Sequence, residues 1–135
     1  MGVGNPGVTG IQYIANNQGA MRNVTLRSSD PQRAGHIGLD LGYTNEQGPC
    51  LLSRITVEGF DIGVRTKHAV DGVVAEFVTL RNQRQVGWLN DGQCVSLRGL
   101  KSENAVPAYH NRARCSAATG CRRSTSTTPT SPAPT

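Results

Sequence analysis

The sequence predicts an all-β fold, namely a right-handed, single-stranded parallel β-helix of about four coils followed by a disordered C-terminal tail. Triplets with apolar residues at positions one and three recur along the chain, such as Ile55-Thr56-Val57 and Ile62-Gly63-Val64. Because residues two apart share a face of a strand, each triplet is a short strand with one apolar face. The composition agrees, since 16 Gly and few aromatic residues (one Trp, three Tyr, two Phe) favour strands and tight turns over a helical bundle.

Two types of triplet alternate along the chain. Centres of the Thr type fall at residues 25, 56, 79 and 99, and centres of the Gly type at 10, 38, 63, 87 and 107. The last copy of the Thr type, Arg98-Gly99-Leu100, is imperfect, and the last copy of the Gly type is Val106-Pro107-Ala108. The spacing shrinks from 31 residues (25 to 56) to 20 (79 to 99), which is the range of solenoid repeats. Turns and loops separate the triplets at residues 1–7, 16–19, 28–35, 44–49 and 90–92.

The segments between a Gly triplet and the next Thr triplet decide between two kinds of solenoid. A leucine-rich repeat needs a fixed leucine scaffold and often a helical return, but no stretch of useful length has a 3.6-residue period. The returns are β-like instead: Cys50-Leu51-Leu52, Val73-Val74 and Cys94-Val95. Three short strands per coil, joined by loops of unequal length, predict a right-handed parallel β-helix.

Stacking of the coils predicts which residues share a column. Four apolar columns are expected to face inward: Val24/Ile55/Val78, Leu26/Val57/Leu80/Leu100, Ile37/Ile62/Val86/Val106 and Leu39/Val64/Trp88/Ala108. Outward, Arg27, Glu58 and Arg81 follow one another, and opposite charges on adjacent coils contribute about a few tenths of a kcal/mol at an exposed surface.

Cys50 and Cys94 lie among apolar residues and are expected to be small core residues. At equivalent positions two coils apart, their separation would be roughly 9 to 10 Å. A disulfide needs Cα atoms within about 7 Å, so both are expected to be free thiols. The other two cysteines, Cys115 and Cys121, lie in the tail.

The chain divides into a β-helix domain over residues 1–111 and a low-complexity tail over residues 112–135. The tail contains no Val, Ile, Leu or aromatic residue, so it lacks the apolar surface that would offset the entropy of ordering. Its Ser, Thr and Pro content is typical of a glycosylated linker. We favour a shifted reading frame, because the repeat stops within a coil.

The formal net charge of +5 comes partly from four arginines of the tail region, Arg112, Arg114, Arg122 and Arg123. The body is only mildly basic, so we expect no nucleic-acid partner. The sequence contains no window of 18 apolar residues, so we expect no membrane span. It also contains no charged start followed by an apolar run, so we expect no signal peptide in this chain. Open coil ends predict self-association.

Three segments carry a resemblance to a known family: IANNQGAMRNVTLRS (14–28), GPCLLSRITVEGFDIGVR (48–65) and FVTLRNQRQVGWLNDGQCVSLRGLKSENAVPAYHN (77–111). They resemble consecutive coils of the pectate-lyase-like β-helix superfamily, in particular the rhamnogalacturonase/epimerase-like pectate lyase domain, over about residues 3–111. The resemblance implies a secreted, extracellular protein that acts on or binds polysaccharides. Members are usually several hundred residues long, so the chain resembles an internal fragment that is inactive alone.

The catalytic motifs of the superfamily are mostly missing. Polygalacturonase-type members use an Asn-Thr-Asp triplet, an Asp-Asp pair, a Gly-His-Gly and an Arg-x-Lys; Gly35-His36-Ile37 matches the third only in part and Arg65-Thr66-Lys67 matches the fourth. Calcium-dependent lyases need several converging carboxylates and an Arg base. Asp40 and Asp61 are expected near each other with Arg65, although a surface ion pair is the favoured interpretation. We assign no catalytic residue, metal ligand or cofactor, and His68 and His110 are interpreted as surface residues.

The Gly triplets indicate the one face where a ligand is expected. Gly38, Gly63 and Gly87 are expected to point outward and form the bare floor of a groove, on which a sugar polymer would lie close to the backbone. Polar columns flank this floor, His36/Asp61/Gln85 on one side and Asp40/Arg65/Leu89 on the other. The candidate substrate-binding residues are therefore His36, Asp40, Asp61, Arg65 and Gln85. Alternatively, another segment packs on this face, or the glycines relieve a bend.

Two functions remain open from the sequence. The first is a fragment of a polysaccharide hydrolase or lyase of the β-helix type. The second is a non-catalytic β-helix module that binds polysaccharide or forms an adhesive or structural surface. The absence of paired acids favours the second for this chain taken alone.

Overall fold

The computed structural model describes residues 3–67 and 72–112. Over these residues the chain forms β-strands and no helix, as expected, so no helix long and apolar enough to cross a membrane occurs among them. The strands are β1 (Thr9–Gln12), β2 (Gly19–Arg27), β3 (Ile37–Asp40), β4 (Cys50–Glu58), β5 (Ile62–Lys67), β6 (Val73–Glu76), β7 (Thr79–Arg81), β8 (Val86–Asp91), β9 (Val95–Arg98), β10 (Lys101–Glu103) and β11 (Tyr109–Asn111).

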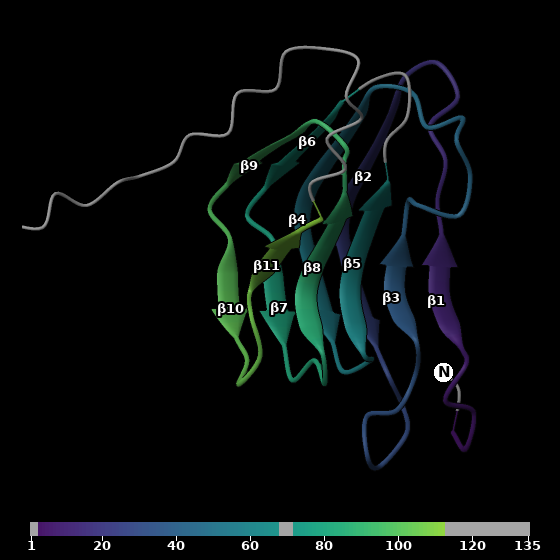
Figure 1. Cartoon of the computed structure of the whole chain (residues 1–135), viewed down its shortest axis with the longest axis vertical. Helices are drawn as coiled ribbons and strands as arrows, with labels where there is room; N and C mark the ends of the chain where they lie inside the picture. Colours follow the sequence, from purple (N-terminus) through teal and green to yellow (C-terminus); the bar gives the residue numbers. More distant parts are fainter. Residues whose placement is uncertain (1–2, 68–71, 113–135) are drawn as a thin grey trace, which may run out of the picture.

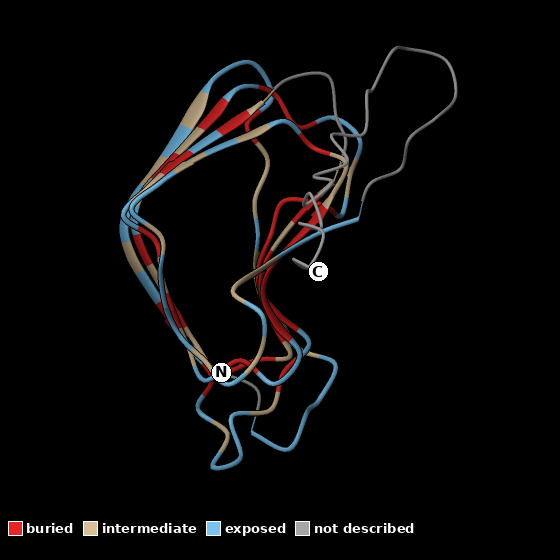
Figure 2. Ribbon diagram, turned by 60° about the vertical axis from the view of Figure 1, so that its left-hand side comes forward, coloured by how far each residue is buried: buried red, intermediate tan, exposed pale blue. Residues whose placement is uncertain are grey.

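Every strand pair is parallel, and the chain winds into a β-helix of about four right-handed coils (Figure 1). Each full coil contributes a segment to each of three walls, and Figure 2 shows the segments of successive coils stacked on one another. The first wall contains the Gly triplets, in the order β1-β3-β5-β8-β11. The second wall contains the return segments: residues 19–22 of β2, 50–53 of β4, β6 and β9. The third wall contains the Thr triplets: residues 24–27 of β2, 55–58 of β4, β7 and β10.

A left-handed residue forms the corner between the second and third walls on every coil. Asn23, Arg54, Phe77 and Gly99 have φ values of 56°, 54°, 54° and 67°. The left-handed region is uncommon for a side chain such as Phe, so the neighbouring strands hold this corner in place. The corner also explains one error of the sequence analysis. Gly99 was expected at a strand centre, but it is the corner of the last coil.

The predicted columns hold through the middle coils and slip in the last one. Leu26, Val57 and Leu80 are in register, as expected, whereas Ser102, and not Leu100, lies beside Leu80. On the first wall, Tyr109 pairs with Trp88, so the expected placement of Val106 and Ala108 was wrong. Ala108 instead lies beside Gly87, whose amide bonds to the carbonyl of Pro107. The imperfect final triplets therefore concealed the true register.

The glycines of the first wall do not point outward as expected. A Cβ on Gly38 would collide with Val57 of the third wall and lie 2.8 Å from the carbonyl oxygen of Gly63. A Cβ on Gly63 would lie 2.5 Å from the carbonyl oxygen of Gly87. The strand pairing between successive coils skips the central glycine of the triplet, which indicates a bend of the strand there. The glycines therefore sit on the inner side of a bend that brings neighbouring backbones close together, as one alternative interpretation held.

The bend divides the apolar residues of the first wall between two faces. Leu39, Val64 and Trp88, which follow the glycines, are fully buried in the main core. Ile37, Ile62 and Val86, which precede them, form a separate cluster with Leu89. The expectation that both sets face the core was correct for the first set and wrong for the second.

A buried polar network lies beside Trp88 at the end of the first wall. The Trp88 Nε1–H donates to Thr66 Oγ1 at 3.0 Å, and Thr66 donates to Asn90 Oδ1 at 2.8 Å. Asn90 Nδ2 donates to the Gln93 carbonyl and to Asn111 Oδ1. Trp88 is thus a core residue, as predicted, and its polar nitrogen is satisfied within the stack.

Cys50 and Cys94 are both free, as predicted. Cys50 is buried, but Cys94 is exposed and lies one position out of step, because Val95 continues the column of Cys50 and Val73. The predictions for His68, for Cys115 and Cys121, and for the tail beyond Arg112 concern positions outside the described residues.

Candidate functional site

The outer face of the first wall carries the two polar columns that the sequence predicts. Ile37 pairs with Ile62 and Ile62 with Val86, which aligns His36, Asp61 and Gln85 one position earlier. The second column is also in register, since Asp40 pairs with Arg65 and Arg65 with Leu89. His36 and Gln85 are exposed. The structure therefore places all five candidate residues on one wall, in two separate columns.

Asp40 and Arg65 form a bidentate ion pair between successive coils. Arg65 Nε lies 2.9 Å from Asp40 Oδ1, and Nη2 lies 2.8 Å from Oδ2. The backbone amide of Gly42 donates a third hydrogen bond to Oδ1 at 2.8 Å. The Asp40 side chain is 2% exposed and that of Arg65 is 31% exposed. Because the carboxylate is buried and fully hydrogen-bonded, it holds Arg65 in place and does not face a ligand.

Asp61 forms its own ion pair and lies far from Asp40. Arg84 Nε and Nη2 lie 2.7 and 2.6 Å from Asp61 Oδ1. Asp61 precedes Arg65, the partner of Asp40, by four residues, so the two carboxylates belong to different columns of the first wall. The expectation that Asp40 and Asp61 lie near each other was therefore wrong. Among the described residues, no group of three or more His, Cys, Asp or Glu is placed to hold a metal ion.

An apolar strip of Ile37, Ile62 and Val86 lies between the two polar columns, and Leu89, the last member of the second column, packs with it in one cluster. This strip takes the place of the bare glycine floor that was expected. Its members are at most 7% exposed. Only the small exposed parts of Ile62 and Leu89, which line a depression on this face, are within reach of a ligand.

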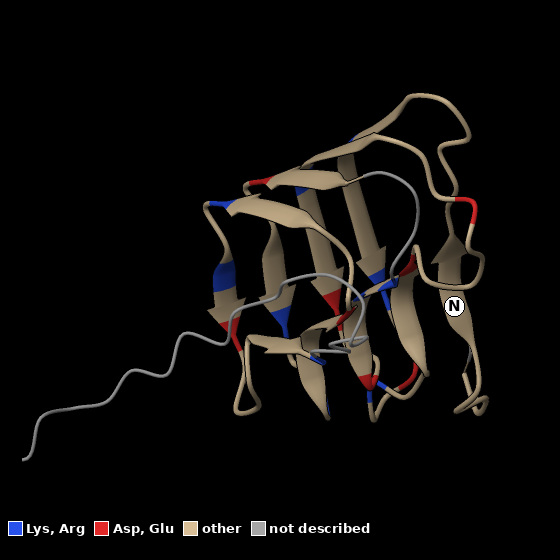
Figure 3. Cartoon of the chain, turned by 45° about the horizontal axis from the view of Figure 1, so that its top comes forward, with Lys and Arg blue, Asp and Glu red and all other residues tan. Residues whose placement is uncertain are grey.

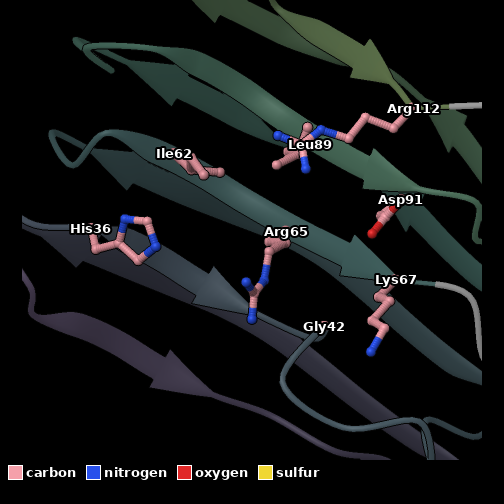
Figure 4. A pocket seen from close by; sticks show the side chains of 8 residues that line it. All are labelled: His36, Gly42, Ile62, Arg65, Lys67, Leu89, Asp91 and Arg112. Carbon is pink, nitrogen blue, oxygen red and sulfur yellow. The ribbon is translucent and has the colours of Figure 1, made fainter.

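A depression of about 220 Å³ opens along this face (Figure 4). It is lined by His36, Gly42, Ile62, Arg65, Lys67, Leu89, Asp91 and Arg112. Figure 4 shows Arg65 and Lys67 on β5, Leu89 and Asp91 on β8, and Arg112 beyond the next strand. Three cationic side chains line the depression together with Asp91. Arg65 is already paired with Asp40, so Lys67 and Arg112 supply the remaining positive charge, which favours an anionic ligand.

Sequence reasoning missed Lys67, Asp91 and Arg112. The signal for Lys67 was present, because it lies two residues after Arg65 and so shares its face. Lys67 also pairs in register with Asp91, a consequence of the Ile62 and Val86 alignment. Arg112 was assigned to the tail, yet its backbone amide bonds to the Asn90 carbonyl at 2.7 Å.

Comparison with family models, with curated proteins and with solved structures finds no match to this chain. The described carboxylates Asp40 and Asp61 are each bound by an arginine, whereas Lys67 and Arg112 carry their charges at the edge of the depression.

Proposed function

We propose that the chain is a polysaccharide-binding segment of an extracellular, carbohydrate-active β-helix protein, and that it binds an acidic sugar chain without cleaving it. In this proposal the protein is a member of the pectate-lyase-like superfamily and close to the rhamnogalacturonase/epimerase-like branch. The observation that carries the proposal is the outer depression, which is lined by Lys67 and Arg112 together with the aliphatic Ile62 and Leu89.

The chemistry of binding follows from these two features. A pyranose ring presents C–H groups on its faces and hydroxyl or carboxylate groups on its edges. Ile62 and Leu89, each 7% exposed, offer a small aliphatic contact to a ring face. Lys67 and Arg112 offer donors to a carboxylate, and charge-assisted hydrogen bonds are about twice as strong as neutral ones.

Binding is favoured over hydrolysis because the carboxylates are wrongly placed. A glycosidase uses two carboxyl groups that lie either about 5 Å or about 6.5–9.5 Å apart. Asp40 and Asp61 belong to different columns of the first wall, and each is bound by an arginine. Neither is free to protonate a leaving group or to attack a sugar.

Calorimetric titration of the full chain tests the proposal. Oligogalacturonate is expected to bind, while a neutral galactan oligosaccharide of equal length binds at least about tenfold more weakly, a difference of about 1.4 kcal/mol. Lys67→Gln and Arg112→Gln should each weaken oligogalacturonate binding about tenfold, since each removes one charge-assisted contact of about 1.5–3 kcal/mol.

Arg54→Gln is the matched control, because Arg54 is an exposed arginine at the corner of the second and third walls. This variant should bind like the parent chain. Equal affinity for the neutral oligosaccharide, or unchanged binding in a Lys67→Gln, Arg112→Gln double variant, would remove the outer depression as the binding site.

A further inference from the structure

Phe77 exposes its aromatic ring at the corner between the second and third walls. The residue is 51% exposed, whereas Phe60, the other Phe of the chain, is 0% exposed and lies in the main core. Both have left-handed φ values, 54° for Phe77 and 70° for Phe60, which are uncommon for a bulky residue. Core packing accounts for the strained backbone of Phe60 but not for that of Phe77. Strain that packing does not explain is often found where a protein contacts a ligand.

The exposure of Phe77 is a property of the corner and not of an end of the stack. The corner residues Asn23, Arg54, Phe77 and Gly99 are exposed on all four coils. Figure 2 shows this edge of the stack in pale blue on successive coils. Phe77 belongs to the third of these coils, so a further coil already covers it on each side along the stack. Its outward surface faces solvent because the corner projects.

The Phe77 ring lies against the bare backbone of Gly99 on the next coil. A Cβ on Gly99 would lie 2.9 Å from Cδ1 and 3.3 Å from Cε1 of Phe77. The Phe77 amide also donates a hydrogen bond to the Arg98 carbonyl at 2.9 Å. The ring is therefore held from one side while about half of the residue remains open to solvent. A ring that is already held in place loses little conformational entropy when a ligand stacks on it.

Glu76 and Arg98 stand beside this ring on adjacent coils. The two residues are in register on β6 and β9, and they directly precede Phe77 and Gly99. Figure 3 shows residues of both charges close together at this corner. Within residues 3–67 and 72–112, neither side chain forms a hydrogen bond or an ion pair. The carboxylate and the guanidinium therefore offer an acceptor and donors next to the apolar ring.

This combination suits a pyranose ring of a neutral sugar. The face of such a ring carries C–H groups that can stack on an aromatic side chain, and its edge carries hydroxyls. The hydroxyls can donate to Glu76 and accept from Arg98. Val74 lies two positions before Glu76 on the same face and is 45% exposed, so it extends the apolar surface along β6.

Two other classes of partner fit these residues less well. Single-stranded nucleic acid is bound by several aromatic rings in a cationic groove, whereas this corner has one ring and a carboxylate beside it. A stable protein interface buries about 800 Å² on each partner around an apolar centre. In the described part of the chain, Val74 and Phe77 are the exposed large apolar residues of this wall and its corner, which is too little for such a centre.

We propose that Phe77, Glu76 and Arg98 form a second sugar-binding site, which takes a pyranose ring of a neutral polysaccharide. Phe77 is the stacking platform, and the two charged side chains bind the hydroxyls at the edge of the sugar. This site is separate from the outer depression, which lies on the first wall. The proposal therefore stands whether or not the outer depression binds an acidic sugar chain.

Phenylalanine labelling of the full chain tests the platform. The chain contains only Phe60 and Phe77, so its labelled ring signals form two sets in an NMR spectrum, and Phe77→Tyr identifies the set of Phe77. A neutral galactan oligosaccharide should shift the Phe77 signals until they saturate, while the signals of the buried Phe60 stay unchanged. Phe77 signals that do not move, or equal shifts of both rings, overturn the proposal.

Phe77→Asn separates the ring from the fold. Asn adopts the left-handed region more readily than Phe and already occupies this corner at Asn23, so the variant should keep the urea midpoint of the parent. Its affinity for the galactan, measured from the amide signals of Glu76 and Arg98, should fall about fivefold or more. Phe77→Tyr keeps the ring and should keep the affinity. A folded Phe77→Asn chain with the affinity of the parent overturns the proposal.

Variants of the two charged residues test the edge of the site without touching the strained backbone. Glu76→Gln and Arg98→Gln should each weaken galactan binding about threefold, because each removes a charged hydrogen-bonding group. Arg54→Gln, at the same corner but on the preceding coil, should bind like the parent. A single-stranded oligonucleotide that shifts the Phe77 signals at lower concentration than the galactan overturns the assignment to sugar. So does a shift of these signals on dilution without sugar, which would indicate contact with a second copy.

Discussion

Arg65 holds the carboxylate of Asp40 on the preceding coil through two parallel hydrogen bonds of 2.9 and 2.8 Å. The pair stands at the edge of the outer depression, where it ties β3 to β5 and orients the guanidinium. On the third wall, Arg27 and Glu58 also form an ion pair between successive coils, but the Arg27 side chain is 69% exposed. The two pairs therefore differ in burial while sharing their chemistry.

This difference predicts unequal costs on removing the arginine. Arg65→Gln leaves the buried Asp40 carboxylate without its charged partner and should lower the free energy of unfolding by about 1–3 kcal/mol. Arg27→Gln should cost less than about 0.5 kcal/mol, because exposed pairs contribute little. Urea unfolding of both variants, followed by circular dichroism, measures the difference. Equal costs would show that Asp40 does not depend on Arg65.

The bend of the first wall predicts intolerance to a single methyl group. In Gly63→Ala the new Cβ would lie 2.5 Å from the carbonyl oxygen of Gly87, so a neighbouring backbone must shift. We expect a loss of about 2–3 kcal/mol, as for an overpacked core. Gly7→Ala is the control, since the nearest atom to its Cβ is Asn5 Oδ1 at 3.5 Å, and it should change stability by less than about 0.5 kcal/mol. A tolerated Gly63→Ala would contradict the inward orientation of the glycines.

The buried polar network predicts a large effect at Asn90. Asn90→Ala removes the acceptor of the Thr66 hydroxyl and of the Gln93 amide and should destabilise the chain by about 2–4 kcal/mol. Asn111→Ala removes one bond at an exposed residue and should cost less than about 1 kcal/mol. Thermal unfolding monitored by the fluorescence of Trp88, the only tryptophan, reports both. Similar midpoints in the two variants would argue against a role for the network in stability.

Burial predicts a dependence of stability on alkaline pH. Desolvation raises the pKa of the Cys50 thiol from 9.0 to about 11. Because the folded chain disfavours the thiolate, this contribution to stability is fully present below about pH 9 and is lost as the pH rises towards 11. The loss should reach at most about 2 kcal/mol. It is measured as the difference between the parent and Cys50→Ala in urea unfolding from pH 8 to pH 11.

Two observations would bear on that prediction. The free energy of unfolding should fall less steeply with pH in Cys50→Ala, because that chain lacks the buried thiol. Other groups that titrate in this range are present in both chains and contribute equally. Thiol reagents should also modify the exposed Cys94 faster than the buried Cys50 at pH 8. Identical pH profiles for the two chains would contradict the assigned burial of the Cys50 thiol.

Much of the fold was predictable because its signals are local and repeated. The period-two pattern around Thr56 and Thr79 predicts strands, and repetition at similar spacing predicts their parallel stacking. The charge ladder of Arg27, Glu58 and Arg81 followed from register alone. The pattern failed in the last coil, where Gly99 is a corner and the imperfect triplets gave no independent register.

The candidate site was predictable only in part. The columns that contain His36 and Asp40 were correct, because aligning one pair of residues on two parallel strands fixes the alignment of the other pairs. The floor between them was wrong, because strict alternation was assumed through Gly38 and Gly63. The grouping of Lys67 and Arg112 depends on the end of β5 and on the residues after β11, where the sequence pattern carries little information.

The sequence by itself determined the class of fold, the three walls of each coil and the alignment of the middle coils. Those properties depend on apolar periodicity and repeat length, both of which can be read directly from the sequence. Only the tertiary structure decided which face each side chain of the first wall occupies, and which arginine binds which carboxylate. The direction of a Cβ at a bend is set by how closely the next coil approaches, as the contact between Gly63 and the Gly87 carbonyl shows. That approach is a property of the packed stack and of no single triplet.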